Sequence, residues 1–408
     1  MCDESCELYG DFKLILNEDS FLINLYQRFP VTLDRGQDAT IWDTDGKEYI
    51  DCMGGYGVAI IGHCNKDVIN AITYQMNKLM VCHMSTYHDS RLQFLSKLNS
   101  IAPVNLGRIF LSNSGAESVE AALKFSRKYS QKTGVISMHG GYHGKTYGAL
   151  SVTYNSKYRK SFSPLLEGIK FVPFGDISSL TEAIDESIGT VIVEPIQGES
   201  GIIMPPEGYV RAVRDICTEK KIVLIFDEIQ TGLGRTGKMW AGQNWSTVPD
   251  IMCIAKGIAS GIPTGVTFVK DEIAKCMSLG EHSSTFAGNP ISCSAGSATI
   301  DAIIKGDLVS KASDTGMYFK NRLVELKDKH PIIRDVRGMG MMLALESRFD
   351  VRDILMDGIK NGLLMLYSGR TIIRLLPPLV MKKEQVSTAI EILDAILSEE
   401  EKRRNVKR

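Results

Sequence analysis

The feature that most constrains the fold of this chain is a series of short apolar segments that alternate with helical patterns from about residue 105 onward. The segments cover residues 108–112, 134–138, 190–194, 221–227 and 251–255. Strands that are buried on both faces of a parallel sheet have this composition. The sequence therefore predicts an α/β protein with a mostly parallel central sheet, whose ligands bind beyond the carboxyl ends of the strands.

On both sides of this region the sequence predicts parts of a smaller α+β domain. An Asp45-Gly46 turn within residues 41–51 predicts a hairpin. After Pro290 helical patterns return, residues 332–346 and 371–376 are strand-like, and an amphipathic helix is expected near residues 385–397. The charged residues 399–408 predict a frayed, solvated helix end. We expect a small domain made of residues 1–52 and 291–408, and a large domain made of residues 53–290.

Composition and charge exclude several classes of protein. Of the 408 residues 44% are hydrophobic and 23% are charged, as in globular proteins and unlike disordered chains. The 47 Lys and Arg residues balance 48 Asp and Glu residues, so no overall charge attracts nucleic acid or an anionic membrane. No apolar run reaches the ~18–20 residues that span a bilayer, and the acidic start differs from a signal peptide. We expect a cytoplasmic protein without nucleic-acid or membrane partners.

The nine cysteines are spread thinly along the chain. Cys2, Cys6, Cys64 and Cys82 lack the paired spacing of a zinc site. A chain of this length also needs no disulfide framework to stabilise its core. The sequence therefore predicts reduced thiols and no metal site.

Two glycine-rich segments imitate nucleotide-binding loops. Residues 232–237 read GLGRTG, but a dinucleotide loop joins a strand directly to a helix, whereas here residues 228–231 intervene and no helical pattern follows. Met239 also stands where a phosphate-binding loop requires Ser or Thr. Residues 140–146, GGYHGKT, are one residue too short for such a loop. The sequence therefore disfavours an ATPase, which stays an alternative.

Three polar groups at predicted strand ends together describe one cofactor. Ser114, Gly115 and Ala116 stand at the predicted start of a helix, where free backbone N–H groups bind phosphate, although a plain helix cap has the same residues. Asp227 ends an apolar strand and needs a cationic partner, either a protonated ring nitrogen or an arginine. Lys256 ends the next strand, where a desolvated amine would bind an aldehyde, although a surface lysine is the plain alternative. A phosphate, a ring nitrogen and an aldehyde are the three handles of pyridoxal 5′-phosphate.

Six motifs carry a resemblance to a known family. They are NSGAE at 113–117, YHGKT at 142–146, EPIQGE at 194–199, FDEIQTGLGRTG at 226–237, AKG at 255–257 and STFAGNP at 284–290. In this order the chain resembles the class III pyridoxal-phosphate-dependent aminotransferases over about residues 26–380. The resemblance implies the fold type I of pyridoxal-phosphate-dependent transferases, and an active site at the interface of a homodimer, which could pair further into a tetramer.

The resemblance also implies which residues bind the cofactor. Asp227 would keep the ring nitrogen protonated, and Lys256 would bind the cofactor aldehyde and then move the proton between substrate and cofactor carbons. Thr285 would bind the phosphate of the neighbouring subunit's cofactor. Gly115 and Ala116 would bind the phosphate by backbone N–H groups, Tyr142 would stack on the ring, and Gln230 would lie near the phenolic oxygen. The full predicted set is Ser114, Gly115, Ala116, Tyr142, Asp227, Gln230, Lys256 and Thr285.

Within the class, the chain is similar to the ω-aminotransferases of acetylornithine, ornithine and carrier-linked lysine precursors. Arg374 matches the arginine that binds the α-carboxylate of glutamate, and Glu199 matches the acid that pairs with it when the ω-amine is bound. Tyr26 lies where ornithine aminotransferases place a substrate tyrosine, although a packing role is an equal alternative, and Ser284 is a further substrate-binding candidate. Lys145 replaces the arginine that acetylornithine enzymes use for a substrate carboxylate, so the fork of a guanidinium is missing.

Residues 152–159 resemble archaeal enzymes of lysine and arginine biosynthesis that act on substrates tethered to an acidic carrier protein. The basic residues Lys157, Arg159 and Lys160 could contact such a carrier, although a solvated basic patch is the commoner meaning. We expect an aminotransferase that moves the ω-amino group of an N-acylated ornithine or lysine to 2-oxoglutarate, giving a semialdehyde and glutamate. The alternatives are an ornithine or 4-aminobutyrate aminotransferase, a glutamate-1-semialdehyde aminomutase and a catalytically silent scaffold.

Overall fold

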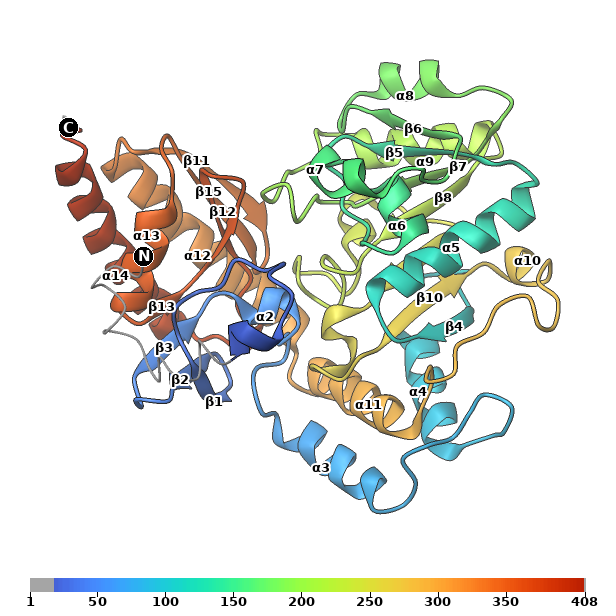
Figure 1. Cartoon of the computed structure of the whole chain (residues 1–408), viewed down its shortest axis with the longest axis horizontal. Coiled ribbons are helices and arrows are strands. Elements are labelled where there is room, and N and C mark those ends of the chain that lie inside the picture. Colours follow the sequence, from blue (N-terminus) through green and yellow to red (C-terminus); the bar gives the residue numbers. More distant parts are fainter. Residues whose placement is uncertain (1–17, 407–408) are drawn as a thin grey trace.

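The computed structural model describes residues 18–406 and is built around a seven-stranded sheet (Figure 1). The strand order is β4-β10-β9-β8-β7-β5-β6. The strands from β5 to β9 run parallel, and β10 is antiparallel to both β4 and β9. Their bounds are β4 (Arg108–Ser112), β5 (Gly134–Met138), β6 (Ile169–Val172), β7 (Ile188–Val193), β8 (Val223–Asp227), β9 (Ile251–Ile254) and β10 (Gly265–Val269). The predicted mostly parallel sheet is confirmed; β6 and β10 are additions to it.

Helices surround this sheet, and α5 (Gly115–Ser130) packs across β4 and β7 to β10. It begins where it does because the Ser114 hydroxyl accepts the Glu117 N–H, and it ends at Gln131, whose φ is 56°. Val119, Ala122 and Phe125 bury its apolar face. The other helical elements of this part are α2 (Gly54–Gly57), α3 (Lys66–Met76), α4 (Asp89–Ile101), α6 (Tyr147–Val152), α7 (Ser156–Arg159), η2 (Lys160–Phe162), α8 (Ile177–Ala183), α9 (Tyr209–Glu219), η3 (Ala241–Trp245), η4 (Lys256–Ala259), α10 (Asp271–Ala274) and α11 (Pro290–Lys305).

Two four-stranded sheets make up the rest of the described strands. One has the order β1-β2-β3-β13, with β1 (Leu33–Gln37), β2 (Thr40–Asp43), β3 (Glu48–Asp51) and β13 (Leu363–Leu364). The other has the order β11-β12-β15-β14, with β11 (Ile333–Met339), β12 (Met342–Ser347), β14 (Leu366–Ser368) and β15 (Ile372–Leu375). The helices α12 (Leu308–Lys329), α13 (Arg352–Lys360) and α14 (Lys383–Arg403) accompany them.

The antiparallel pairing of β2 with β3 confirms the predicted hairpin. Because β13 pairs in parallel with β3, the blue N-terminal hairpin lies beside the orange and red C-terminal elements in Figure 1. The N-terminal hairpin and the C-terminal elements thus lie together in one part of the molecule, away from the seven-stranded sheet. The domain boundaries at 52 and 290 stay a prediction.

The expectation of a frayed, solvated helix end over residues 399–408 is wrong for Glu400 and Glu401, whereas Glu399, Lys402, Arg403 and Asn405 are exposed. Helix α14 continues to Arg403, and Glu400 and Glu401 are only 1% and 3% exposed. Glu400 bonds to Arg404, and the Oε2 atom of Glu401 lies 3.2 Å from Nδ1 of His330, which is fully buried at the end of α12. Since His330 precedes Glu401 by 71 positions, local sequence gives no sign of this pairing.

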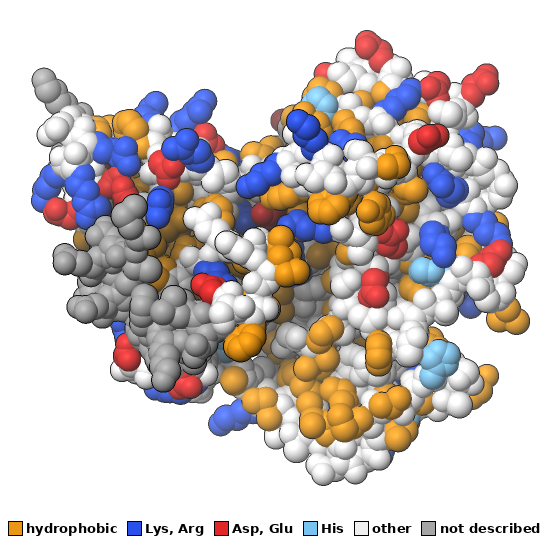
Figure 2. Space-filling view, viewed as in Figure 1, with side chains coloured by type: hydrophobic (Ala, Val, Ile, Leu, Met, Phe, Trp, Pro, Cys, Tyr) orange, Lys and Arg blue, Asp and Glu red, His pale blue; other side chains and the backbone are white. Residues whose placement is uncertain are grey.

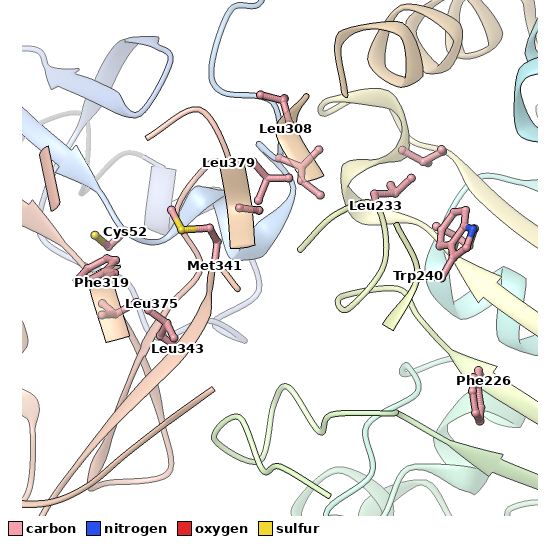
Figure 3. Packing of buried hydrophobic residues seen from close by; sticks show 14 of the residues in the cluster. Cys52, Phe226, Leu233, Trp240, Leu308, Phe319, Met341, Leu343, Leu375 and Leu379 are labelled. Atoms are coloured by element: carbon pink, nitrogen blue, oxygen red, sulfur yellow. The ribbon is translucent and has the colours of Figure 1, made fainter. Parts of the chain in front are cut away.

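A continuous hydrophobic core connects the two parts of the molecule (Figure 3). It runs from Phe226 and Trp240 through Leu233 to Leu379 and Met341. The glycine-rich segment 232–237 is a buried turn at this junction and not the strand-to-helix connection of a nucleotide loop.

Arg235, in that turn, is fully buried. Its Nη1 atom donates to the carbonyl oxygens of Met341, at 3.0 Å, and Pro377. Burial lowers the pKa of its guanidinium to about 9. Arg235 thereby links the turn after β8 to the backbone just before β12 and to the backbone after β15.

Among residues 18–406, no helix is both long and apolar enough to cross a bilayer. In the same range no group of three or more His, Cys, Asp or Glu side chains is arranged to hold a metal ion. The cysteines of this range, Cys52, Cys64, Cys82, Cys217, Cys253, Cys276 and Cys293, are free thiols. The acidic start of the chain, with Cys2 and Cys6, lies outside the described residues.

Candidate active site

A cavity of about 380 Å³ lies at the carboxyl ends of β4, β8 and β9. It is placed where open α/β sheets bind their ligands. The sequence candidates that line it, from segments far apart in the chain, are Ser114, Gly115, Ala116, Tyr142, Lys145, Glu199, Asp227, Gln230 and Lys256. Folding therefore brings most of the predicted set to one place.

The N-terminus of α5 forms one end of the cavity. The first turn of a helix has N–H groups without intrahelical acceptors, and Gly115 and Ala116, which line the cavity, stand in that turn. A Cβ atom at Gly115 would lie 2.8 Å from the Ile229 side chain, so any larger residue there would require Ile229 to shift. Asn113, also in the wall, donates from Nδ2 to Ser284 Oγ at 2.9 Å and so places Ser284 beside the cavity.

Asp227 forms the floor of the cavity together with His143. The two side chains are buried, and Asp227 Oδ2 lies 2.8 Å from His143 Nδ1. Asp227 Oδ1 accepts the Ile229 N–H at 3.1 Å. Because a carboxylate accepts, Nδ1 of His143 is assigned the hydrogen. His143 was missing from the predicted site, since the sequence gives no sign that it pairs with a residue 84 positions away.

Glu194 is a second buried acid beside this pair, and it too was missing from the prediction. Its Oε2 accepts the Tyr142 N–H at 2.9 Å and its Oε1 accepts the Gly198 N–H at 3.1 Å. Burial, with a smaller contribution from nearby Asp227, raises the pKa of Glu194 to about 7 against the opposing influence of His143. Its presence in the quoted 194–199 motif was the available signal.

Lys256 follows β9 and starts η4 with a left-handed backbone, φ 45°. The side chain is partly buried. Burial lowers the pKa of its amine, against the opposing influence of Asp227, Glu199 and Glu194. A lysine of lowered pKa is more often neutral near pH 7, and the neutral amine is the nucleophile.

Tyr142 and Gln230 complete the inner wall. Burial raises the pKa of the Tyr142 phenol to about 12, so its hydroxyl stays protonated. The Gln230 Oε1 atom is buried and has no hydrogen-bond partner among the described residues. A buried amide without a partner is costly in a closed structure. The part of the cavity next to Gln230 Oε1 therefore suits a polar group of a ligand.

A second cavity, of about 570 Å³, adjoins the first, and Tyr142 and Glu199 line both. It contains Arg374, which is 1% exposed and whose Nη1 lies 2.9 Å from Glu199 Oε2. The remaining Arg374 contacts are backbone carbonyls, with Nε donating to Tyr367 O and Nη1 to Gly198 O, both at 3.2 Å. Three phenols that sequence reasoning did not single out also line this cavity: Tyr56, Tyr158 and Tyr367.

Two predicted residues do not join the site within this chain. Tyr26 is 74% exposed and lines a separate hollow with Asp19 and Arg28. Thr285 is exposed and lines neither cavity. Lys145 lines the first cavity, with its Nζ atom 4.7 Å from the ring centroid of Tyr158.

Comparison with protein families decides the class. The family model described as Aminotransferase class-III matches residues 23–397. The chain belongs to this family. The predicted family and the predicted fold are therefore confirmed, and class III aminotransferases are pyridoxal-phosphate-dependent enzymes.

Individual relatives of this aminotransferase agree with the assignment. It is 40% identical over 391 residues to the acetylornithine aminotransferase of Methanocaldococcus jannaschii, covering 94% of this chain and 97% of the relative. It is 37% identical over 382 residues to ornithine aminotransferase 1 of Staphylococcus aureus, covering 91% and 96%. Among solved structures, the ornithine aminotransferase of Toxoplasma gondii matches with a TM-score of 0.92 and 29% identity, covering 96% of this chain and 95% of that one.

The residues present in this aminotransferase fit pyridoxal phosphate. The free N–H groups of α5 suit its phosphate, the buried Asp227 carboxylate suits a protonated ring nitrogen, and the amine of Lys256 suits its aldehyde. The unpartnered Oε1 end of Gln230 offers a further polar contact. Each handle of the cofactor thus has a side chain or backbone group of matching chemistry in one cavity.

Proposed function

We propose that this aminotransferase moves the ω-amino group of an N-acylated ornithine or lysine to 2-oxoglutarate, giving a semialdehyde and glutamate for arginine or lysine biosynthesis. The observation that carries this proposal is the Glu199–Arg374 ion pair beside the cavity of Lys256 and Asp227. An arginine that a carboxylate can cover or uncover lets one cavity serve an amine donor and a dicarboxylate in turn. Similarity to acetylornithine aminotransferases supports an acetylated donor.

The residues of this chain divide the reaction between them. Bound pyridoxal phosphate supplies an aldehyde carbon and an electron-accepting ring. Lys256 takes a proton at Nζ from one carbon and returns it to another, for which burial lowers its pKa. Asp227 keeps a negative charge at the cavity floor, and His143 holds that carboxylate in place. Glu194 fixes the backbone of Tyr142, whose ring would lie against the cofactor.

Substrate exchange would follow the position of Glu199. With Glu199 on Arg374, the guanidinium is neutralised and an uncharged end of the donor fits there. When Glu199 turns away, Arg374 becomes available for a carboxylate of 2-oxoglutarate or glutamate. The partial exposure of Glu199, against the full burial of Arg374, makes the acid the movable partner.

A donor carried by an acidic protein is a finer alternative within this proposal. Lys157 and Lys160 are exposed, whereas the Arg159 guanidinium lies 4.5 Å over the Phe171 ring. The basic surface of residues 157–160 is therefore smaller than the sequence suggests, and it supports a carrier less strongly than Glu199 and Arg374 support the transamination itself.

We also propose that two copies of the chain assemble as a homodimer. Large apolar side chains are exposed along α3 and the segment after it, where hydrophobic side chains gather in the lower part of Figure 2: Ile69, Tyr74, Met76, Leu79, Met80, Val81, Met84 and Tyr87. Phe286, beside Thr285, is 71% exposed as well. Arg91 Nε donates to the Gly288 carbonyl oxygen at 3.0 Å, which joins this surface to the loop of Thr285. Contiguous apolar surface of this kind is typical of an interface.

The dimer is tested by light scattering of the eluted protein and by the Val81→Glu variant. We expect the wild type to elute as a dimer and V81E to shift toward the monomer and lose activity, because Thr285 would no longer reach a neighbouring site. A monomeric, active wild type would contradict this part of the proposal. Gln243→Glu, on the exposed surface of η3, is the matched control.

A donor panel tests the proposed reaction. N-acetylornithine, N-acetyllysine, free ornithine, lysine and 4-aminobutyrate are each incubated with 2-oxoglutarate, and glutamate is measured. We expect the highest kcat/KM with an N-acylated donor. A preference for free ornithine or 4-aminobutyrate would favour the corresponding aminotransferase, and activity on glutamate-1-semialdehyde without 2-oxoglutarate would favour an aminomutase.

A further inference from the structure

We propose that Arg337 is a positioning residue for Glu199: it holds the turn that follows Glu199 in a strained conformation and so keeps this carboxylate on Arg374 during the donor half-reaction. The inference rests on the proposed function and deepens it, since it names a group that sets which substrate the site accepts. Arg337 lies on β11 and lines neither of the two cavities, so it acts through another residue.

The backbone around Glu199 is held on both sides. The N–H groups of Gly201 and Ile202 donate to the Gly198 carbonyl oxygen, at 3.2 and 3.3 Å, and close a turn. The carbonyl oxygen of Glu199 itself accepts the Ser368 hydroxyl at 2.6 Å. The side chain of Glu199 is therefore the part that can rotate, and the turn decides where that rotation starts.

This turn contains a strained residue. Ile202 has a left-handed backbone conformation, with φ 56°. That region is unfavourable for L residues, and most of all for β-branched ones. The Ile202 side chain is fully buried and belongs to an apolar cluster with Ile196 and Met342. A strained residue persists only where its surroundings hold it. The structure therefore has to supply contacts that keep the turn in this form.

Arg337 supplies such contacts from the small sheet. Its Nε atom donates to the carbonyl oxygens of Gly201, at 3.0 Å, and Ile202, at 3.1 Å, and its Nη2 atom donates to Gly201 O at 2.8 Å. Its Nη1 atom donates to Asp335 and Glu346, at 2.9 and 2.6 Å, and these carboxylates orient the guanidinium. The bonds to the turn thus connect β11 with the segment between β7 and α9, which extends toward β11 in Figure 1.

The Glu199–Arg374 ion pair depends on the turn for its geometry. Arg374 is fixed, because its Nε and Nη1 atoms also donate to the carbonyl oxygens of Tyr367 and Gly198. The carboxylate of Glu199, on a side chain that is 36% exposed, has to meet a guanidinium that does not follow it. If the turn relaxed, the carboxylate would shift and leave Arg374 uncovered more often. Loss of Arg337 should consequently weaken the donor half-reaction, in which the pair is closed, and spare that of glutamate, in which it is open.

Single-turnover rates of the two half-reactions, measured on the holoenzyme with N-acetylornithine and with glutamate, provide the test. With Arg337→Met, we expect kcat/KM for N-acetylornithine to fall about 3- to 10-fold, the effect of one hydrogen bond, while the value for glutamate changes less than about twofold. Arg334→Met is the matched control, because Arg334 lies on the same strand and pairs with the same Glu346, but its side chain is 67% exposed. It should leave both values unchanged.

A double variant separates an action through Glu199 from an independent one. Once Glu199→Gln has removed the ion pair, adding R337M should cause no further loss for the donor. Arg337→Lys keeps the charge that faces Asp335 and Glu346, but an ammonium lacks the planar fork that reaches two carbonyl oxygens. We expect R337K to shift the ratio of the two half-reactions in the same direction as R337M, and it provides the same test if R337M does not fold.

The inference is overturned if neither R337M nor R337K changes the ratio of the two half-reactions, or if R337M lowers the donor rate of E199Q as much as that of the wild type. If the wild type does not use N-acetylornithine but turns over ornithine, the proposed acylated donor is wrong. The ratio between the ornithine and glutamate half-reactions then still decides the role of Arg337.

Discussion

The floor and the rim of the active-site cavity are held together in different ways. On the floor, Asp227, His143 and Glu194 are buried and each is fixed by hydrogen bonds to neighbouring groups. On the rim, Lys145 and Glu199 are more exposed, and each makes one side-chain contact, with Tyr158 and Arg374 respectively. Groups that are preorganised in a dry environment suit the constant chemistry of a cofactor. Single contacts at a wet rim suit the exchange of substrates.

The largest effect is expected from Lys256→Ala, which removes the amine at the floor. Turnover should fall by more than about 10³-fold, because the variant loses both the amine that would bind the cofactor aldehyde and the group proposed to move the proton. Glutamate formed from 2-oxoglutarate is the measurement. Lys238→Ala, at an exposed position, should leave activity unchanged. An active K256A enzyme would refute the assignment of the floor as the reaction centre.

Asp227→Asn removes the charge of the floor and keeps its shape. A hydrogen bond to a charged group contributes about 1.5–3 kcal/mol, so we expect kcat to fall about 10- to 150-fold. Circular dichroism should show an unchanged fold. Asp215→Asn, on the exposed side of α9, is the control, and a D227N rate within twofold of the wild type would show that the buried charge is unimportant.

Glu199→Gln tests the rim. Without the ion pair, Arg374 stays available to carboxylates, and glutamate then competes for the place of the ω-amine donor. We expect kcat/KM for the donor to fall about 10-fold, the value of a charged hydrogen bond at its lower limit, with glutamate unaffected. Single-turnover rates of the two half-reactions measure this; an equal loss in both would contradict a role specific to the rim.

The smallest effect is on stability and concerns Glu228, which is buried next to Asp227 and accepts the N–H groups of Ala241 and Gly242 at 2.6 and 2.9 Å. Burial raises its pKa from 4.5 to about 7. Between these values the folded chain binds a proton that the unfolded chain has released, so stability decreases as the pH rises and is constant above about 7.

We therefore expect Tm to decline by a few degrees between pH 5 and pH 7, and to decline less in Glu228→Gln. Thermal unfolding followed by circular dichroism at several pH values measures this. Glu182→Gln, exposed on α8, should retain the wild-type slope. A slope in E228Q equal to that of the wild type would show that Glu228 does not titrate in this range.

The sequence predicted the buried strands well because apolar runs report burial directly. The bounds of β4 and β5 agree with the predicted residues 108–112 and 134–138. Strand β1 was missed because four of its five residues are exposed, so it has no apolar period. The end of α14 was wrong because Glu400 and Glu401 are buried by partners that local sequence does not reveal.

The site shows the same division. Asp227, Lys256 and the start of α5 could be predicted because each follows an apolar strand. His143 and Arg337 could not, since their importance comes from hydrogen bonds in three dimensions, to Asp227 and to the backbone after Glu199 respectively. The residues Thr285 and Tyr26 stay predictions, because within one chain they lie outside both cavities.

The buried guanidinium of Arg235 has a consequence for how substrates enter the cavity. Its bonds to the carbonyl oxygens of Met341 and Pro377 join the glycine-rich turn to the start of β12 and to the segment after β15, the strand that contains Arg374. A rotation that moved the seven-stranded sheet away from the two four-stranded sheets would break these hydrogen bonds and expose the apolar side chains around Leu233 and Leu379. We therefore expect admission of each reactant to depend on side-chain rotation at the mouth, in a body that stays rigid through the catalytic cycle.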